Sequence, residues 1–246
     1  MGNGGREVHT FCVMEPQRIL QREDGKVDLY PRSFIFSLAY IEWMARDFLE
    51  TIPWPPFNQP SLSAMKKPEI TVFDGQEFIL IDCGSQVEIL SPLLHAPTPL
   101  INEIFPSTDH FVLSTIADMC GGSCAKKEVL RLHNIKEARE FAHSHVMRDF
   151  TDQENLILLE RVASGSYLKF LHYSEARDSL LSTGDVPIIA CGNDSYIAKH
   201  YSCGLGKAVF QPYGFPGSNY LGQLLMAIRS HFRNQSEQDL WTVVNL

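Results

Sequence analysis

The chain has 246 residues, of which 44% are hydrophobic and 20% are charged. This composition excludes a disordered or repeat protein, and the length suffices to bury a sizeable core in one large domain or two small ones. Its 29 acidic residues outnumber its 21 basic residues and give a formal net charge of −8. Direct binding of nucleic acid is therefore disfavoured, because neutralising phosphates requires a basic surface.

The sequence predicts neither membrane association nor export. Its apolar runs are shorter than the ~20 residues that a membrane span requires, and its first residues lack the hydrophobic segment of a signal peptide. Arg6 occupies the position at which a myristoylation signal requires Ser or Thr. We therefore expect a soluble intracellular protein of the cytoplasm, the nucleus or both.

The six cysteines are scattered along the chain, and we expect them to be reduced. Cys120 and Cys124 are separated by three residues, a spacing that zinc sites allow. The histidines that could complete such a site are His133, His143 and His145. The sequence has no second cysteine pair that could complete the site, so it favours buried or loop thiols. We predict no metal site and no cofactor.

The first 68 residues are expected to form an N-terminal extension. Residues 33–52 predict a helix that Pro53 ends, and its apolar arc is wider than a surface helix normally shows. Either this helix is packed within its own domain, or one flank is kept for another protein. Five prolines between Pro53 and Pro68 predict an extended connector. Residues 69–246 are then expected to form the main domain.

The main domain is predicted to begin with a β-hairpin and to continue mostly with helices. Asp74-Gly75 suits a tight hairpin turn, because both residues tolerate a positive φ. Strands are expected over 69–73, 77–82 and 187–191, helices from Ser107 or Thr108 to about 119, near 136–149, over 152–170, over 174–182 and from Ser218, and a Gly-rich loop over 202–217. The fold class is therefore α+β, predominantly helical with a small β portion.

Several motifs in this domain resemble one known family. Residues 217–229 read GSNYLGQLLMAIR and residues 180–184 read LLSTG. They match a Gly-x-Asn-x-Leu-Gly-x-x-Leu-Met-x-x-Arg helix start and a Leu-Leu-x-Thr-Gly element of the NADAR superfamily of YbiA-like N-glycosidases. Over about residues 76–233, the order and spacing of the motifs are similar to that family. The resemblance implies a NADAR/YbiA-like domain, and the N-terminal helical extension lies outside it.

Active members of the family hydrolyse N-glycosidic bonds, which requires an acid or base near the leaving nitrogen. The family's catalytic motif, Pro-x-Ser-Glu-His-Tyr, corresponds to residues 106–111, where Asp109 replaces the glutamate. The side chain of Asp is one methylene shorter, and a misplacement of ~1 Å can lower the rate by about 10². His110 in this motif is expected to be a hydrogen-bonded core histidine rather than a catalyst.

The other departures from the family point in the same direction. The family's Gln and Lys on this helix fall at or near Leu113 and Ile116, and its Trp before the long helix corresponds to Phe150. The loop motif keeps Asn193 and Asp194, but its Trp and Gly are replaced by Ile and Ala. The sequence therefore predicts a vestigial pocket, formed by Asp109, Phe150, Asn193 and Asp194, without catalytic residues. The glycines and apolar residues that are kept suit structural roles.

These observations favour a pseudoenzyme, a catalytically inactive NADAR-like domain that acts as an adaptor between proteins. Its candidate partner-binding residues are Trp43, Trp54 and Phe57 of the N-terminal extension.

Two alternatives stay open. One is a divergent N-glycosidase for an ADP-ribose-like or nucleotide substrate, in which Asp109 is the acid or base and Asp194 helps to place the ribose; even the inactive domain could keep weak affinity for such a ligand. The other is a non-catalytic reader of a nucleotide or an RNA end. That reader would need a local basic patch, for which the candidates are Lys126, Lys127, Arg131 and Arg229.

Overall fold

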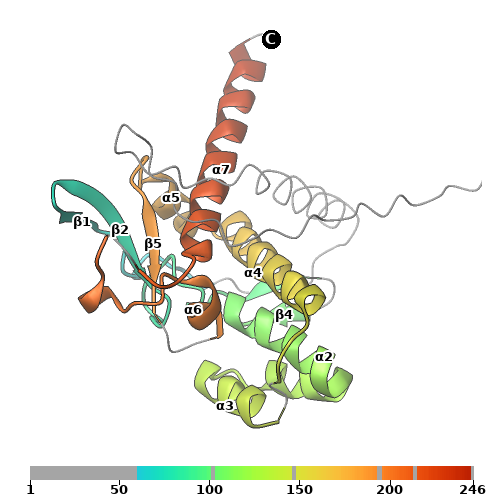
Figure 1. Cartoon of the computed structure of the whole chain (residues 1–246). Coiled ribbons are helices and arrows are strands. Elements are labelled where there is room, and N and C mark those ends of the chain that lie inside the picture. The colour runs from blue at the N-terminus through green and yellow to red at the C-terminus, as the bar shows by residue number, and fades with distance from the viewer. Residues whose placement is uncertain (1–59, 101–102, 146–147, 193–195, 213–214, 245–246) are drawn as a thin grey trace, which may run out of the picture. The chain divides into compact units, whose positions relative to one another are not determined.

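The computed structural model describes residues 60–244 except for 101–102, 146–147, 193–195 and 213–214 (Figure 1). The predicted helix over 33–52 lies outside this part of the chain. The predicted site residues outside it are Trp43, Trp54, Phe57, Asn193 and Asp194. The predicted domain boundary after residue 68 stays a prediction.

Helices dominate the described part of the chain, and the strands are short. The elements in chain order are β1 (Ile70–Phe73), β2 (Gln76–Asp82), β3 (Thr98–Leu100), β4 (Glu103–Phe105), α2 (Thr108–Arg131), α3 (Ile135–His145), α4 (Asp152–His172), α5 (Ser174–Leu181), β5 (Ile188–Cys191), α6 (Tyr196–Tyr201), the 3-10 turn η1 (Lys207–Val209) and α7 (Tyr220–Val244). This arrangement confirms the predicted α+β class. None of the described helices is both long and apolar enough to cross a membrane.

The predicted hairpin is present as β1 and β2. Asp74 and Gly75 form its turn with φ angles of 48° and 78°, as a tight turn with two left-handed residues requires. Strand β5 then pairs in parallel with β2, so the sheet has the order β1-β2-β5. Strands β3 and β4 form a separate antiparallel pair that the sequence did not predict.

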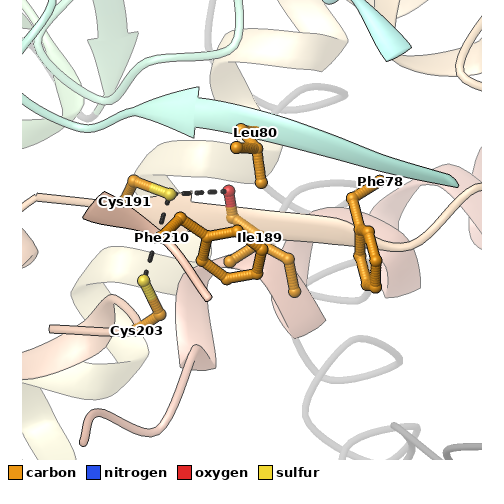
Figure 2. Packing of buried hydrophobic residues seen from close by; sticks show 6 residues of the cluster. All are labelled: Phe78, Leu80, Ile189, Cys191, Cys203 and Phe210. Atoms are coloured by element: carbon orange, nitrogen blue, oxygen red, sulfur yellow. Dashed lines mark hydrogen bonds between the residues drawn. The ribbon is translucent and has the colours of Figure 1, made fainter. Parts of the chain in front are cut away.

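The loop after α6 covers one face of the three-stranded sheet, and α7 lies along the outer side of β5. Phe78 and Leu80 of β2 and Ile189 of β5 lie on one face of the sheet. Residues of the loop that follows α6 pack on these side chains (Figure 2). Helix α7 packs on β5, and the amide of Ile188 donates to the sulfur of Met226 at 3.4 Å. The strands therefore carry apolar side chains on both faces, as a buried strand needs.

Helices α2 and α4 pack against each other, and α3 packs on α2 (Figure 1). Gly165 of α4 allows the close approach, because a Cβ there would lie 2.9 Å from the Phe111 ring and 3.1 Å from the methyl group of Thr108. Helix α2 does not end near residue 119 as predicted. It kinks at Gly122, which has a φ of 72°, and resumes its helical course to Arg131.

Candidate functional site

The first turn of α2 carries the residues that match the family's catalytic motif. Ser107 caps the helix, and its hydroxyl oxygen accepts a hydrogen bond from the backbone amide of His110 at 3.2 Å. The amide of Asp109 donates to the carbonyl of Pro92 at 3.2 Å. These contacts fix Asp109 in the core, where its exposed fraction is 0%.

The carboxylate of Asp109 is engaged by a basic residue of α3. Nε of Arg139 donates to Oδ2 of Asp109 at 2.9 Å, across thirty positions of the chain. The Nη2 atom of Arg139 is buried and has no hydrogen-bond partner among the described residues. A charge-assisted bond of this kind is stronger than a neutral hydrogen bond. The acid expected at this position is thus bound by the protein's own guanidinium group.

Both ring nitrogens of His110 have partners inside the protein. Nδ1 lies 2.8 Å from the hydroxyl of Ser107, and Nε2 lies 3.0 Å from the carbonyl of Leu132. Burial lowers the pKa of His110 to about 4, so the ring is neutral at pH 7. With Nε2–H donating to Leu132 and Nδ1 accepting from Ser107, the ring joins the two ends of α2. This geometry supports the predicted role of a core histidine.

Apolar side chains lie at or near the positions of two polar residues of the family motif. Leu113 and Ile116 are fully buried in the core. A hollow with a volume of about 10 Å³ lies beside α2, which is room for about one water molecule and not for a nucleotide sugar. Its lining residues are Thr98, Phe105, Ser107, Thr108, Phe111, Gly165 and Leu168.

Phe150 precedes α4 and is half-buried. The guanidinium of Arg148 lies 5.3 Å from the centre of its ring, and the same Arg148 pairs with Glu154. The pKa of Glu154 is lowered to about 2, mainly by its hydrogen bond with Arg148 and to a smaller extent by its hydrogen bonds with Thr151. Glu154 and Thr151 form the capping box of α4, so Phe150 lies in the segment that starts this helix.

The structure does not bring Phe150 and Asp109 together. Gly165 of α4 lies against Thr108, the neighbour of Asp109. At 1.5 Å per helical residue, Asp152 at the start of α4 is about 20 Å away from Gly165, and Phe150 lies before Asp152. Asn193 and Asp194 are outside the described residues, so the predicted pocket stays a prediction for those two residues.

Of the four basic residues proposed for a nucleotide reader, three lie on α2 and the fourth, Arg229, is buried and cannot share a surface patch with them. Lys126 pairs with Glu103 at 2.7 Å, and Arg131 pairs with Glu128 at 2.8 Å. Arg229 is buried and donates to the hydroxyl of Thr183 and the carbonyl of Val186 (Nη1 at 2.7 Å and 2.9 Å). Lys127 is exposed.

The cysteine pair proposed for zinc lies on α2, where Cys120 is half-buried and Cys124 is exposed. Within the described part of the chain, no group of three or more His, Cys, Asp or Glu side chains could hold a metal ion.

The motif at the start of α7 builds the contact between this helix and the sheet. The side-chain amide of Asn219 accepts from the amide of Ala190 at 2.8 Å and donates to the carbonyl of Ile188 at 3.1 Å. A Cβ at Gly222 would lie 2.3 Å from the Ile188 carbonyl oxygen and 2.4 Å from Oδ1 of Asn219. Only glycine fits at Gly222, because no Cβ approaches a backbone oxygen so closely.

Two residues at these sites were not predicted from the sequence. Arg139 carries no motif, and its contact with Asp109 depends on where α3 packs. Asn219 was noticed as part of a motif, but its role at the edge of β5 was not deduced. Its position two residues after a glycine, at the start of an apolar helix, was the available signal.

Comparisons with known proteins support the resemblance. The model of the NADAR domain matches residues 83–233. No curated protein gives a significant match. The chain is similar to the NMR structure of the Escherichia coli protein YbiA, with a TM-score of 0.52 and 14% sequence identity over 72% of this chain and 95% of that chain. At this identity the likeness shows the fold alone. Since the family match spans more than half of the sequence, the chain belongs to the NADAR domain family.

Proposed function

We propose that this NADAR domain is catalytically inactive and acts as an adaptor that binds another protein. The observation that carries the proposal is the state of Asp109. The family's acid position holds a shorter side chain that is fully buried and hydrogen-bonded to Arg139. A general acid or base must come within hydrogen-bonding distance of its substrate. In Asp109, the Arg139 guanidinium already forms a hydrogen bond with Oδ2, the atom that a substrate would have to reach.

The surroundings of Asp109 add support. A site for a nucleotide sugar needs several placed polar groups in a hollow of a few hundred Å³. On α2, the buried aliphatic residues Leu113 and Ile116 lie at or near the positions of two such groups, and His110 uses both ring nitrogens within the protein. Such a region stabilises the fold and offers little to a substrate.

The adaptor role rests on the N-terminal extension. Trp43, Trp54 and Phe57 are large aromatic side chains of the kind that anchors protein interfaces. The net charge of −8 favours a protein partner over a nucleic acid. We place this interaction inside the cell, in the cytoplasm, the nucleus or both.

The catalytic part of the proposal is tested by titrating the full chain with ADP-ribose in a calorimeter, and by analysing incubations with ADP-ribosylated nucleotides for released ribosyl groups. We expect neither saturable binding nor turnover at millimolar ligand. The alternative, an N-glycosidase that uses Asp109, would be established if turnover is observed and Asp109→Ala removes it. The control variant, Glu140→Ala on the exposed face of α3, should then leave the turnover intact. Binding without turnover would instead indicate a reader of ADP-ribose.

The adaptor part is tested by affinity purification with the full chain and with the double variant Trp54→Ala, Phe57→Ala. We expect partners of the wild-type chain to be lost from the double variant by at least about tenfold, because aromatic anchors carry much of the binding energy. The control is Val72→Ala, which shortens an exposed side chain on β1. An equal thermal midpoint for all three chains shows that the fold is kept. Undiminished binding by the double variant would contradict the proposed surface.

A further inference from the structure

Two buried cysteines lie side by side where β5 ends. The sulfur atoms of Cys191 and Cys203 are 3.9 Å apart and share a hydrogen bond (Figure 2). Both side chains are fully buried, and both thiols are free. The amide of Cys203 donates to Ala190, and the amide of Gly192 donates to Leu205, each at 2.8 Å. These backbone bonds hold the two cysteine-bearing segments alongside each other.

The contact makes the two thiols chemically unequal. The hydrogen bond with Cys191 lowers the pKa of Cys203, because a thiol donor stabilises the neighbouring thiolate. The same hydrogen bond, together with burial, raises the pKa of Cys191. Cys191 ends the fully buried strand β5, whereas Cys203 adjoins the half-buried segment 204–207, so we assign Cys203 as the nucleophile of the pair and Cys191 as the second thiol.

The two sulfur atoms must come closer before a bond can form between them. A disulfide needs a sulfur–sulfur distance of about 2 Å, so the two atoms must approach by roughly another 2 Å. A glycine with a positive φ follows each cysteine, Gly192 at 139° and Gly204 at 76°. Residues 204–207 are only half-buried, so a small opening of this segment gives a molecule of the size of hydrogen peroxide access to Cys203.

We propose that Cys191 and Cys203 are a redox-sensitive pair that a small hydroperoxide oxidises to a disulfide. The Cys203 thiolate attacks the peroxide, so that an S–O bond forms, the O–O bond breaks and the leaving oxygen takes up a proton as water. The sulfur of Cys191 then attacks the sulfenic acid of Cys203. The S–S bond forms, the S–O bond breaks, and the hydroxide leaves with the Cys191 proton as a second water. The two thiols lose two electrons and the peroxide gains them.

The disulfide closes a ring of the chain over residues 191–203, which contains Asn193, Asp194 and helix α6. This is the segment that matches the Asn-Asp motif of the family. Because a cross-link restricts the unfolded chain, oxidation is expected to raise the thermal midpoint by several degrees. The oxidant level would thus set the thermal stability of the domain.

The test is to expose the full chain to hydrogen peroxide, unfold it, alkylate the remaining thiols and map the peptides by mass spectrometry. We expect a loss of 2 Da and two protected thiols, both in one cross-linked pair of peptides that carry Cys191 and Cys203, and the reductant dithiothreitol should reverse both. Cys120 and Cys124 of α2 are the internal controls, because both are free and more exposed than Cys191 and Cys203. If peroxide modifies these two while Cys191 and Cys203 remain alkylatable, the proposal is wrong.

Two variants test the roles within the pair. In Cys191→Ser, peroxide should leave a sulfenic acid on Cys203 that dimedone traps, because no second thiol can resolve it. In Cys203→Ser, both the cross-link and the dimedone adduct should be missing. A dimedone adduct on Cys191 in Cys203→Ser, with none on Cys203 in Cys191→Ser, would reverse the assigned roles and overturn the inference about the nucleophile.

Discussion

The start of α7 and the start of α2 both match motifs of the NADAR family, but they differ in what the motif residues do. At α7, Asn219 and Gly222 are present and bind helix to sheet through close backbone contacts. At α2, Asp109 stands where the motif has a glutamate, Leu113 and Ile116 lie at or near the positions of its Gln and Lys, and all three are buried. The comparison teaches that the motif at α7 is matched by residues on which packing depends, whereas the motif at α2 is matched less well by residues that lie in the core.

The largest expected effect is at α7, where Gly222→Ala should destabilise the protein by about 3 kcal/mol or more. The added Cβ would meet the Ile188 carbonyl at 2.3 Å, and neither this backbone oxygen nor the Asn219 amide can move without losing hydrogen bonds. Chemical denaturation gives the free energy of unfolding. Gly206→Ala is the matched control, because a Cβ there meets no atom within 4 Å. Equal stability of the two variants would remove the structural reason for the motif.

The next effect is at α2, where Asp109→Leu should cost about 2 to 3 kcal/mol, because it leaves the Arg139 guanidinium without its carboxylate. The double variant Asp109→Leu, Arg139→Leu should regain most of this loss, since replacing both members of a buried pair is often nearly neutral. Denaturation of the four chains of this double-mutant cycle measures the coupling. A coupling close to zero would mean that the pair does not hold α3 on α2.

A third prediction concerns Lys169 of α4, which holds the loop before α2. Its Nζ donates to the carbonyl of Ser91, and burial lowers the pKa of Lys169 to about 7. In the unfolded chain the lysine stays charged up to pH ~10, so the unfolded state binds more protons and the stability rises as the pH rises through 7.

When the pH rises from 7 to 9, the contribution of Lys169 to the free energy of unfolding should increase by about 2 kcal/mol. The measurement is the stability of the wild-type chain and of Lys169→Met at both pH values. Taking the difference between the two chains cancels the titration of buried cysteines, which both share. A difference that does not change with pH would show that Lys169 is not desolvated in solution.

The smallest effect is expected at the surface. Lys126→Ala should change the stability by less than about 0.5 kcal/mol, because its partner Glu103 is partly exposed and such pairs contribute little. It should also leave the affinity for a short RNA oligonucleotide unchanged in a fluorescence titration. A marked loss of RNA affinity would revive the nucleotide reader.

Local features of the fold were predictable from the sequence, whereas contacts between distant segments were not. Asp74-Gly75 predicts its hairpin because its turn depends on two adjacent residues, and the strand over 187–191 was placed within one residue. The continuation of α2 past Gly122 was missed, since a glycine pair normally ends a helix and packing overrides that preference here.

The candidate site shows the same limit. The substitution at Asp109 was visible from the motif, but its partner Arg139 was not, because their contact depends on how α3 packs on α2. The approach of Cys203 to Cys191 likewise depends on the course of the chain through α6. Patterns along the sequence report neighbours within a few residues, and these two pairs lie beyond that reach.

The hydrogen bonds along the outer side of β5 bear on how the domain avoids aggregation. The side-chain amide of Asn219 forms hydrogen bonds with the Ile188 carbonyl and the Ala190 amide. The next two groups, the Ala190 carbonyl and the Gly192 amide, form hydrogen bonds with the backbone of Cys203 and Leu205. These are the groups to which an incoming strand of another molecule would bind. Among the described strands of this sheet, growth by strand addition is therefore left to the outer side of β1 alone.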